Sequence, residues 1–308
     1  MGDIDTRAVE QLARMLPGWQ EIELRFEPIA LGITNRNYRV TLPDGTSYVV
    51  RIPGERTEVL GIDRSCEAEA ARRAADLGIG PPVLAELPGV GTLVTQFVAG
   101  RHALDDAEFA RNLPAVASAL RRFHESGPIA GQFPIHRVVE WHARDAARHG
   151  VDPPPIYREL HDQSTAIEAA FERAPMAAVP CHNDLLPANV LLDVDAGRVW
   201  LLDFEYAGMN DVFFDLGNLA VNSNLLPDGD EALLVAYFGV VTRARLARLQ
   251  LMKIMSELRE GMWAVVQQAI STLTNVDFVA YADERLSNCA VLCDRTDFGR
   301  WLTEAAAL

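Results

Sequence analysis

The chain carries Cys-His-Asn-Asp-Leu-Leu-Pro-Ala-Asn at residues 181–189 and Leu-Leu-Asp-Phe-Glu at residues 201–205. These segments place the side-chain oxygens of Asp184, Asn189 and Asp203 on two loops that flank a short apolar strand. Phosphotransfer needs such a set, because one carboxylate orients and deprotonates the acceptor hydroxyl while an amide and a second carboxylate hold Mg²⁺. The alternative is two polar turns around a β-hairpin, with Asp and Asn as turn formers. Both segments together, at this spacing, favour phosphotransfer.

Bulk composition predicts an ordinary globular enzyme. The 308 residues are 49% hydrophobic and 23% charged, and the formal net charge is −15. This charge would repel nucleic-acid phosphates and attract a small cationic substrate, although acidity also serves solubility alone. The first residues lack a signal-peptide pattern and no apolar run reaches membrane-spanning length, so no membrane insertion is expected. Four scattered cysteines favour a reducing cytoplasm, and we expect a monomer or homodimer.

Strand and turn signals alternate through the first hundred residues. Strands are expected at 22–29, 38–42, 47–52, 83–87 and 92–97, with helices at 4–16 and 63–77. After Gly100 helical patterns dominate and one hairpin, 190–192 with 199–202, interrupts them. Helices are expected at 105–125, 136–149, 155–173, 228–238, 242–270 and 277–307. We therefore predict an α+β fold of protein-kinase-like plan, with a small antiparallel β N-lobe carrying one helix (1–97) for nucleotide and a large, mostly helical C-lobe (98–308) for catalysis and substrate.

Two segments of the N-lobe are expected to bind ATP. Between the first two strands, Gly32 permits close backbone approach, and Thr34 and Asn35 offer hydroxyl, amide and backbone donors to phosphate. A turn of this composition is common, so the prediction depends on the rest of the pattern. Gln96 and Val98 belong to the segment that joins the lobes, where backbone groups are expected to bind the adenine edge.

A cation on the third strand is expected to hold the phosphates. The only lysine of the chain is Lys253, in a late helix, so Arg51 in Tyr-Val-Val-Arg-Ile is the candidate. A guanidinium can grip phosphate through two donors and stays charged at any working pH. The next helix offers Glu67 as a partner that would orient Arg51. Glu69 is a competitor, although its position points to a different helix face.

Other polar residues near the two loops are expected to support the structure. His182 would brace the catalytic loop through hydrogen bonds, and Asp215 would anchor backbone amides of that loop. His124, in Leu-Arg-Arg-Phe-His, is expected to be a packed structural residue rather than a catalyst.

These motifs resemble the choline/ethanolamine kinases, within the wider aminoglycoside phosphotransferase-like superfamily. The catalytic loop is shared with antibiotic kinases, and the Arg51 strand and the Trp263 helix are more discriminating. The resemblance spans roughly residues 30 to 290. It is carried by His-Asn-Asp-Leu-Leu-Pro-Ala-Asn, Asp-Phe-Glu-Tyr-Ala-Gly-Met-Asn (203–210), Ile-Thr-Asn-Arg-Asn-Tyr (33–38), Val-Val-Arg and Met-Trp-Ala-Val-Val-Gln-Gln-Ala-Ile-Ser (262–271).

The resemblance implies ATP- and Mg²⁺-dependent phosphorylation of a small alcohol. Asp184 would be the catalytic base, and the metal ligands would be Asn189 and Asp203, with help from Glu205 for metal or substrate. Trp263 and Tyr281 would be two aromatic groups of a cage for a substrate ammonium, since aromatic faces attract such cations. On the residues alone, Trp263 is equally well explained as a core anchor of its helix.

The chain also departs from the family pattern. Glu260 stands where many members have a second tryptophan, and Asn222 and Asn224 occur where a caging tyrosine is expected. We expect an amino-alcohol kinase, with choline first and ethanolamine or a methylated ethanolamine as alternatives. A kinase acting on an aminoglycoside or other natural product, and a nucleotide-binding pseudokinase, are competing hypotheses. The pseudokinase is disfavoured because Asp184, Asn189 and Asp203 are all present.

Overall fold

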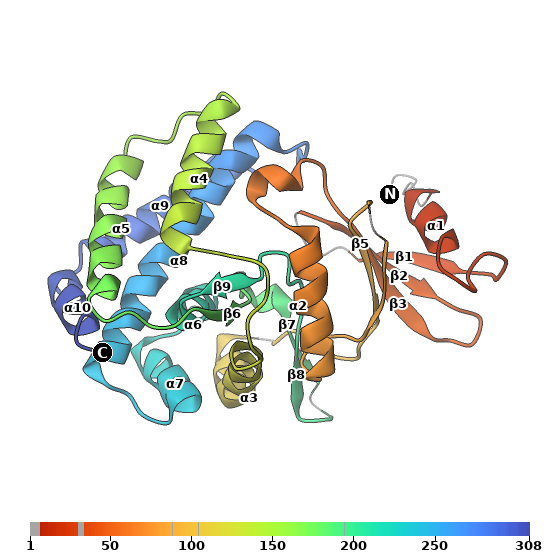
Figure 1. Ribbon diagram of the computed structural model, residues 1–308, viewed down its shortest axis with the longest axis horizontal. Coiled ribbons are helices and arrows are strands. Elements are labelled where there is room, and N and C mark those ends of the chain that lie inside the picture. The colour runs from red at the N-terminus through yellow and green to blue at the C-terminus, as the bar shows by residue number, and fades with distance from the viewer. Residues whose placement is uncertain (1–6, 30–33, 88, 104, 194) are drawn as a thin grey trace.

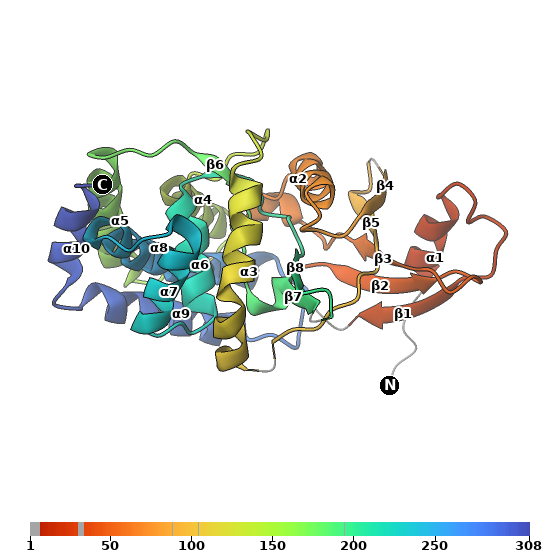
Figure 2. The same ribbon diagram turned by 90° about the horizontal axis from the view of Figure 1, so that it is seen from below.

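The computed structural model describes residues 7–29, 34–87, 89–103, 105–193 and 195–308. Figure 1 shows a β-sheet lobe at one end and a larger helical lobe at the other, and Figure 2 shows the same division from below. The N-lobe sheet has the order β1-β2-β3-β5-β4, and every neighbouring pair is antiparallel. Its strands are β1 (Arg25–Ile29), β2 (Arg36–Thr41), β3 (Ser47–Ile52), β4 (Val83–Leu87) and β5 (Thr92–Gln96).

The N-lobe sheet has its own small core. Alternation along β2 and β3 sends Val40 and Val50 to one face, where both are fully buried. Helix α1 (Arg7–Arg14) and Trp19 cover that face. The hairpin between β2 and β3 turns at Gly45, whose φ of 87° lies in the left-handed region that glycine adopts without strain. The strands expected at 38–42 and 47–52 therefore form a hairpin.

Helix α2 (Arg64–Asp76) lies between the sheet and the C-lobe in both views (Figures 1 and 2). Asp63 begins it by accepting hydrogen bonds from the amides of Ser65 and Cys66, after a short 3₁₀ turn, η1 (Thr57–Leu60). Its alanine face belongs to the same buried cluster as the C-lobe helices. Arg73 also donates to the carbonyls of residues 126–128. Helix α2 is thus packed as part of the C-lobe core.

The C-lobe is built around α8 (Arg243–Ile270), which is buried over most of its length. Against it pack α4 (Ile135–Arg148), α5 (Tyr157–Glu172), α6 (Val212–Asn222), α7 (Pro227–Phe238), α9 (Phe278–Cys293) and α10 (Phe298–Ala305), and α3 (Asp106–His124) packs on α7. Two strand pairs complete it, β6 (Val179–Cys181) with β9 (Gly208–Asn210), and β7 (Val190–Asp193) with β8 (Arg198–Leu201). Within the described ranges, no helix has both the length and the apolar character needed to cross a bilayer.

The predicted α+β, protein-kinase-like fold is confirmed, with differences in detail. Helix α6 and the pair β6–β9 were not expected from the sequence. The helix expected at 277–307 is two helices, because the segment between Cys293 and Phe298 leaves the helical path. The division into lobes at residues 97 and 98 stays a prediction.

Helices α6 and α8 approach so closely at Gly217 that no side chain fits between them. A Cβ at Gly217 would lie 2.7 Å from the carbonyl carbon of Met252 and 2.9 Å from the amide of Lys253. We predict that Gly217→Ala lowers the free energy of unfolding by about 1–3 kcal/mol, since backbone atoms must move apart. Urea denaturation monitored by circular dichroism measures this change.

The matched control is Gly299→Ala in α10, where an added Cβ meets nothing within 4 Å. Alanine there should raise stability by about 0.5 kcal/mol, because it restricts the unfolded chain. Equal effects of the two substitutions would contradict the close helix contact.

Candidate active site

A cavity of about 610 Å³ lies between the lobes. The groups expected to bind nucleotide, metal and acceptor come together on its walls, although they are scattered over 250 residues of sequence. The predicted residues that line it are Thr34, Arg51, Gln96, Val98, Asp184, Asn189, Asp203, Glu205, Glu260, Trp263 and Tyr281. Glu67 and Asn35 are buried and contact the lining residues, and Gly32 lies outside the described residues.

Arg51 joins three parts of the molecule. From β3 it forms an ion pair with Glu67 of α2, and its Nη1 lies 2.8 Å from the Oδ1 of Asp203 in the C-lobe. The side chain is nearly buried, so both partners are held in a region where charges are weakly screened. The predicted pairing of Arg51 with Glu67 is confirmed. Glu69 pairs instead with Arg73 on another face of the helix.

Arg64, at the start of α2, is a second cation that the sequence analysis missed. Its guanidinium lies 2.8 Å from Glu67 and 3.3 Å from Glu205, and it donates to the side-chain oxygen of Asn35 at 3.2 Å. Asn35 in turn donates to Glu205 at 2.8 Å. The side chain of Asn35, expected to contact phosphate, therefore contacts a carboxylate of the C-lobe. Its role in ATP binding stays a prediction.

Asp215 of α6 anchors the loop after β6 through hydrogen bonds to backbone amides. The two oxygens of Asp215 accept hydrogen bonds from the amides of His182 and Asn183, each at 2.7 Å. Asn183 has a φ of 64°, a left-handed conformation that asparagine tolerates. The Nε2 of His182 donates to the carbonyl of Leu202 at 2.8 Å, and this hydrogen bond braces the two loops against each other. The predicted supporting roles of Asp215 and His182 are confirmed.

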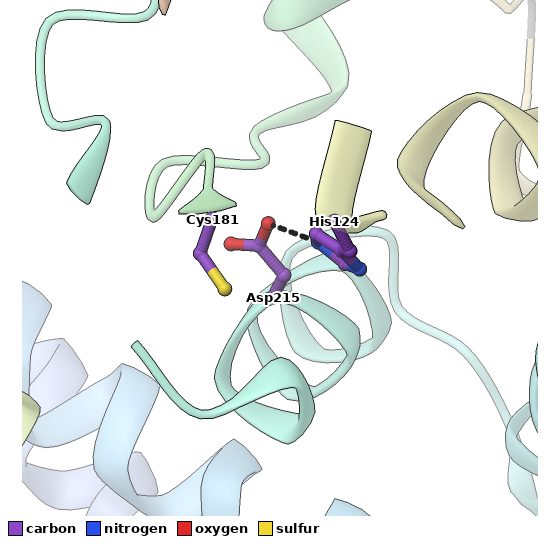
Figure 3. Close-up of side chains that lie close together, drawn as sticks. All are labelled: His124, Cys181 and Asp215. Carbon is purple, nitrogen blue, oxygen red and sulfur yellow. Dashed lines mark hydrogen bonds and ion pairs between the residues drawn. The ribbon is translucent and has the colours of Figure 1, made fainter. Parts of the chain in front are cut away.

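The oxygen Oδ2 of Asp215 also contacts His124, whose other ring nitrogen lies 2.7 Å from the hydroxyl of Tyr237. Figure 3 shows Asp215 between His124 and Cys181. The three side chains offer ligand atoms within 4.8 Å of one another. Because Asp215 is already engaged by two amides and an imidazole, we interpret the cluster as structural support. His124 is thus the packed residue that was expected.

Asp184 faces the cavity at the centre of the site. Arg259 of α8 lies 3.0 Å from its Oδ1, and the side-chain amide of Asn189 donates to its carbonyl at 2.8 Å. Burial raises the pKa of Asp184 to about 7, against the opposing effect of the Arg259 charge. The Asn189 amide also donates to Oδ2 at 3.3 Å, and each carboxylate oxygen has a second lone pair. A carboxylate with this raised pKa can receive a proton from an acceptor hydroxyl.

The chemistry of the predicted metal ligands fits Mg²⁺. Asn189 directs its amide nitrogen to the backbone of Asp184, which leaves the amide oxygen as its ligand atom. Asp203 has a φ of 63° and a side chain that is 25% exposed, and its Oδ1 is held by Arg51. Burial and the neighbouring Asp203 raise the pKa of Glu205 to about 7. This set of hard oxygen atoms on the cavity wall is the kind that Mg²⁺ prefers.

Aromatic and acidic groups gather at the α8–α9 end of the cavity. The indole of Trp263 donates to the hydroxyl of Tyr206 at 2.9 Å, and its ring centre lies 6.1 Å from that of Tyr281. Tyr281 donates to Glu260 at 3.2 Å. Asn222 is turned toward Arg285, 3.4 Å away. Trp263, Tyr281 and Glu260 thus form one wall, as the substrate assignment requires, and that assignment stays a prediction.

Comparison with known proteins gives the family. The model of the Phosphotransferase enzyme family (APH) matches residues 25–249. The chain belongs to that family. This phosphotransferase is 25% identical to ethanolamine kinase 2 of Mus musculus over 306 residues, which cover 91% of this chain and 79% of that protein. It is 28% identical to Protein LicA of Haemophilus influenzae over 224 residues, which cover 67% and 60% of the two chains.

Solved structures agree with this assignment. The crystal structure of a choline/ethanolamine kinase family protein from Mesorhizobium loti matches the phosphotransferase with a TM-score of 0.84 and 29% identity, over 98% of this chain and 99% of that one. The resemblance to the choline/ethanolamine kinases and the prediction of a phosphotransferase are confirmed.

Asp215 should be essential for the local structure of the phosphotransferase. We predict that Asp215→Ala lowers the free energy of unfolding by about 3 kcal/mol, because two buried amides and a buried imidazole lose their acceptor. Denaturant titration measures the loss. Asp193→Ala is the control, since Asp193 also accepts a backbone amide and an arginine but lies at the half-buried end of β7. A similar small effect for both variants would show that Asp215 is dispensable.

Proposed function

We propose that this phosphotransferase transfers the γ-phosphoryl group of ATP to the hydroxyl of an amino alcohol, with choline as the first candidate. The observation that most strongly supports this proposal is the position of Asp184 in the cavity. It lies between the Arg51–Asp203 side of the site and the wall of Trp263, Tyr281 and Glu260. Relatives named ethanolamine kinase and choline kinase support the choice of acceptor.

Different residues would bind the phosphates, the adenine and the metal ion. Arg51 would grip phosphate oxygens, with its direction set by Glu67. Gln96 and Val98 would border the adenine, and Thr34 would lie over the phosphates. Mg²⁺, held by Asn189 and Asp203 with Glu205 nearby, would neutralise charge on the phosphates.

Asp184 would accept the hydrogen bond of the substrate hydroxyl and take its proton as the new O–P bond forms. Because the transition state of phosphoryl transfer is loose, alignment and charge neutralisation should supply most of the acceleration. Burial of Asp184 in a site closed by both lobes serves that alignment.

A second acceptor class is favoured by one observation. Glu260 offers carboxylate oxygens where the family pattern has an aromatic ring, and a carboxylate can accept hydrogen bonds from N–H groups. Ethanolamine and its methylated forms carry such groups, whereas the trimethylammonium of choline does not.

The four cysteines form no disulfide, which supports a reducing cytoplasm as the place of action.

The test is ADP release from Mg-ATP with choline, ethanolamine, N-methylated ethanolamines, thiamine or kanamycin as acceptor. Turnover with choline or an ethanolamine would support the proposal, and the ratio of kcat/KM values would rank the two classes. Asp184→Asn should lower kcat by about 100-fold or more while ATP still binds. Turnover with kanamycin alone, or an active Asp184→Asn enzyme, would refute it.

Trp263 should recognise the acceptor rather than the nucleotide. We predict that Trp263→Leu raises KM for the amino alcohol by about 5- to 30-fold and leaves KM for ATP within about twofold, because a cation–π contact contributes about 1–2 kcal/mol in a desolvated site. Steady-state kinetics with each substrate varied in turn measure both constants. Trp200→Leu, on β8, is the control for loss of an indole in the same lobe. Equal increases in both KM values for Trp263→Leu would indicate a structural role.

A further inference from the structure

The middle of α8 carries several buried charges, among them the adjacent pair Arg259 and Glu260. The Arg259 side chain is 1% exposed, and its guanidinium carbon lies 4.4 Å from the ring centre of Tyr206. Its Nη1 lies 3.0 Å from the Oδ1 of Asp184 and also contacts a carboxylate oxygen of Glu260. One buried nitrogen therefore joins the predicted base to the predicted acceptor wall.

Burying a guanidinium costs desolvation free energy, so its position depends closely on the groups that pair with it. A guanidinium is tolerated in a protein interior only when it is paired, and here both partners are carboxylates of the same cavity. The contact at Oδ1 and a longer hydrogen bond of 3.3 Å from the Asn189 amide to Oδ2 fix the carboxylate plane of Asp184. A second lone pair of Oδ2 stays available to the acceptor hydroxyl. The stacking on Tyr206 limits the guanidinium to one orientation.

The other carboxylate is fixed in the same way. Glu260 contacts Arg259 through Oε1 and accepts from the hydroxyl of Tyr281 through Oε2. Asp184 and Glu260 would repel each other at close range without the cation between them. The distance between the base and the acceptor wall thus depends on one side chain.

We propose that Arg259 is a positioning residue that sets the orientation of Asp184 and its separation from Glu260. This inference rests on the proposed role of Asp184 as the base. Arg259 acts through its two carboxylate partners. Its removal should therefore lower the rate of phosphoryl transfer and weaken acceptor binding, while the Arg51 side of the cavity keeps its affinity for nucleotide.

The experiment compares Arg259→Leu, Arg259→Gln and Arg259→Lys in the full chain, with the acceptor that the panel identifies. We expect Arg259→Leu to lower kcat by about 100-fold, the size of effect seen when reacting groups are misplaced by about 1 Å. The dissociation constant of ATP should stay within about threefold. Arg259→Lys keeps the charge and should recover at least tenfold of the lost kcat, whereas Arg259→Gln keeps only a donor and should recover less.

The matched control is Arg248 of the same helix, which is also fully buried. Arg248 donates to the carbonyls of Ala174 and Ala305 and stacks on Phe171, away from the cavity. Arg248→Leu should lower the melting temperature at least as much as Arg259→Leu, yet keep kcat within about twofold. If Arg259→Leu does not fold, Arg259→Lys and Arg259→Gln carry the comparison through the difference between their kcat values.

The outcomes separate this inference from the proposed function. An inactive Asp184→Asn enzyme with an Arg259→Leu enzyme of normal kcat would overturn only the role of Arg259. Loss of ATP binding in step with kcat, or equal kcat values for the Lys and Gln variants, would also overturn it. An active Asp184→Asn enzyme would remove the proposed base and the inference together.

Discussion

The site depends on one buried cation, Arg51, which is held by carboxylates from two sides. Glu67 approaches from α2 and Asp203 from the loop of the C-lobe, so the third strand of the sheet is tied to both. Neither contact is replaceable by water, because the arginine is almost completely buried. The same pairs that fix Arg51 also hold Asp203, a metal-ligand candidate, on the cavity wall, so the same groups serve the structure and the proposed chemistry.

Carboxylates outnumber the guanidinium groups that they pair with around the cavity. Five carboxylates, Glu67, Asp184, Asp203, Glu205 and Glu260, share the three guanidinium groups of Arg51, Arg64 and Arg259. Burial, with a further contribution from the neighbouring carboxylates, raises the pKa values of Asp184 and Glu205 to about 7. A site of this kind attracts cations, which agrees with the proposed metal and ammonium ligands.

Much of the fold and site could be predicted because the signals were local. The two loop segments and the strand containing Arg51 are short motifs whose chemistry is readable, and the nearby Glu67 follows from helix position. Helix α6 was missed because nearly all its residues are buried, so it has no polar face to give a helical period. Arg64 and Arg259 were missed because the carboxylates that bring them into the site, Glu205 and Asp184, lie 141 and 75 residues away in the sequence.

The N-lobe sheet has its own core, which allows it to unfold locally. The cluster around Trp19, Val40 and Val50 is distinct from the one that includes α2 and the C-lobe helices. Packing of this kind allows the sheet to unfold as its own cooperative unit while α2 stays docked, so amides of β2 and β3 should exchange hydrogen through a lower-energy opening than those of α8. A nucleotide that contacts both clusters would couple the local unfolding of the sheet to that of the C-lobe helices. Slower hydrogen exchange in the sheet would then indicate that the cavity is occupied.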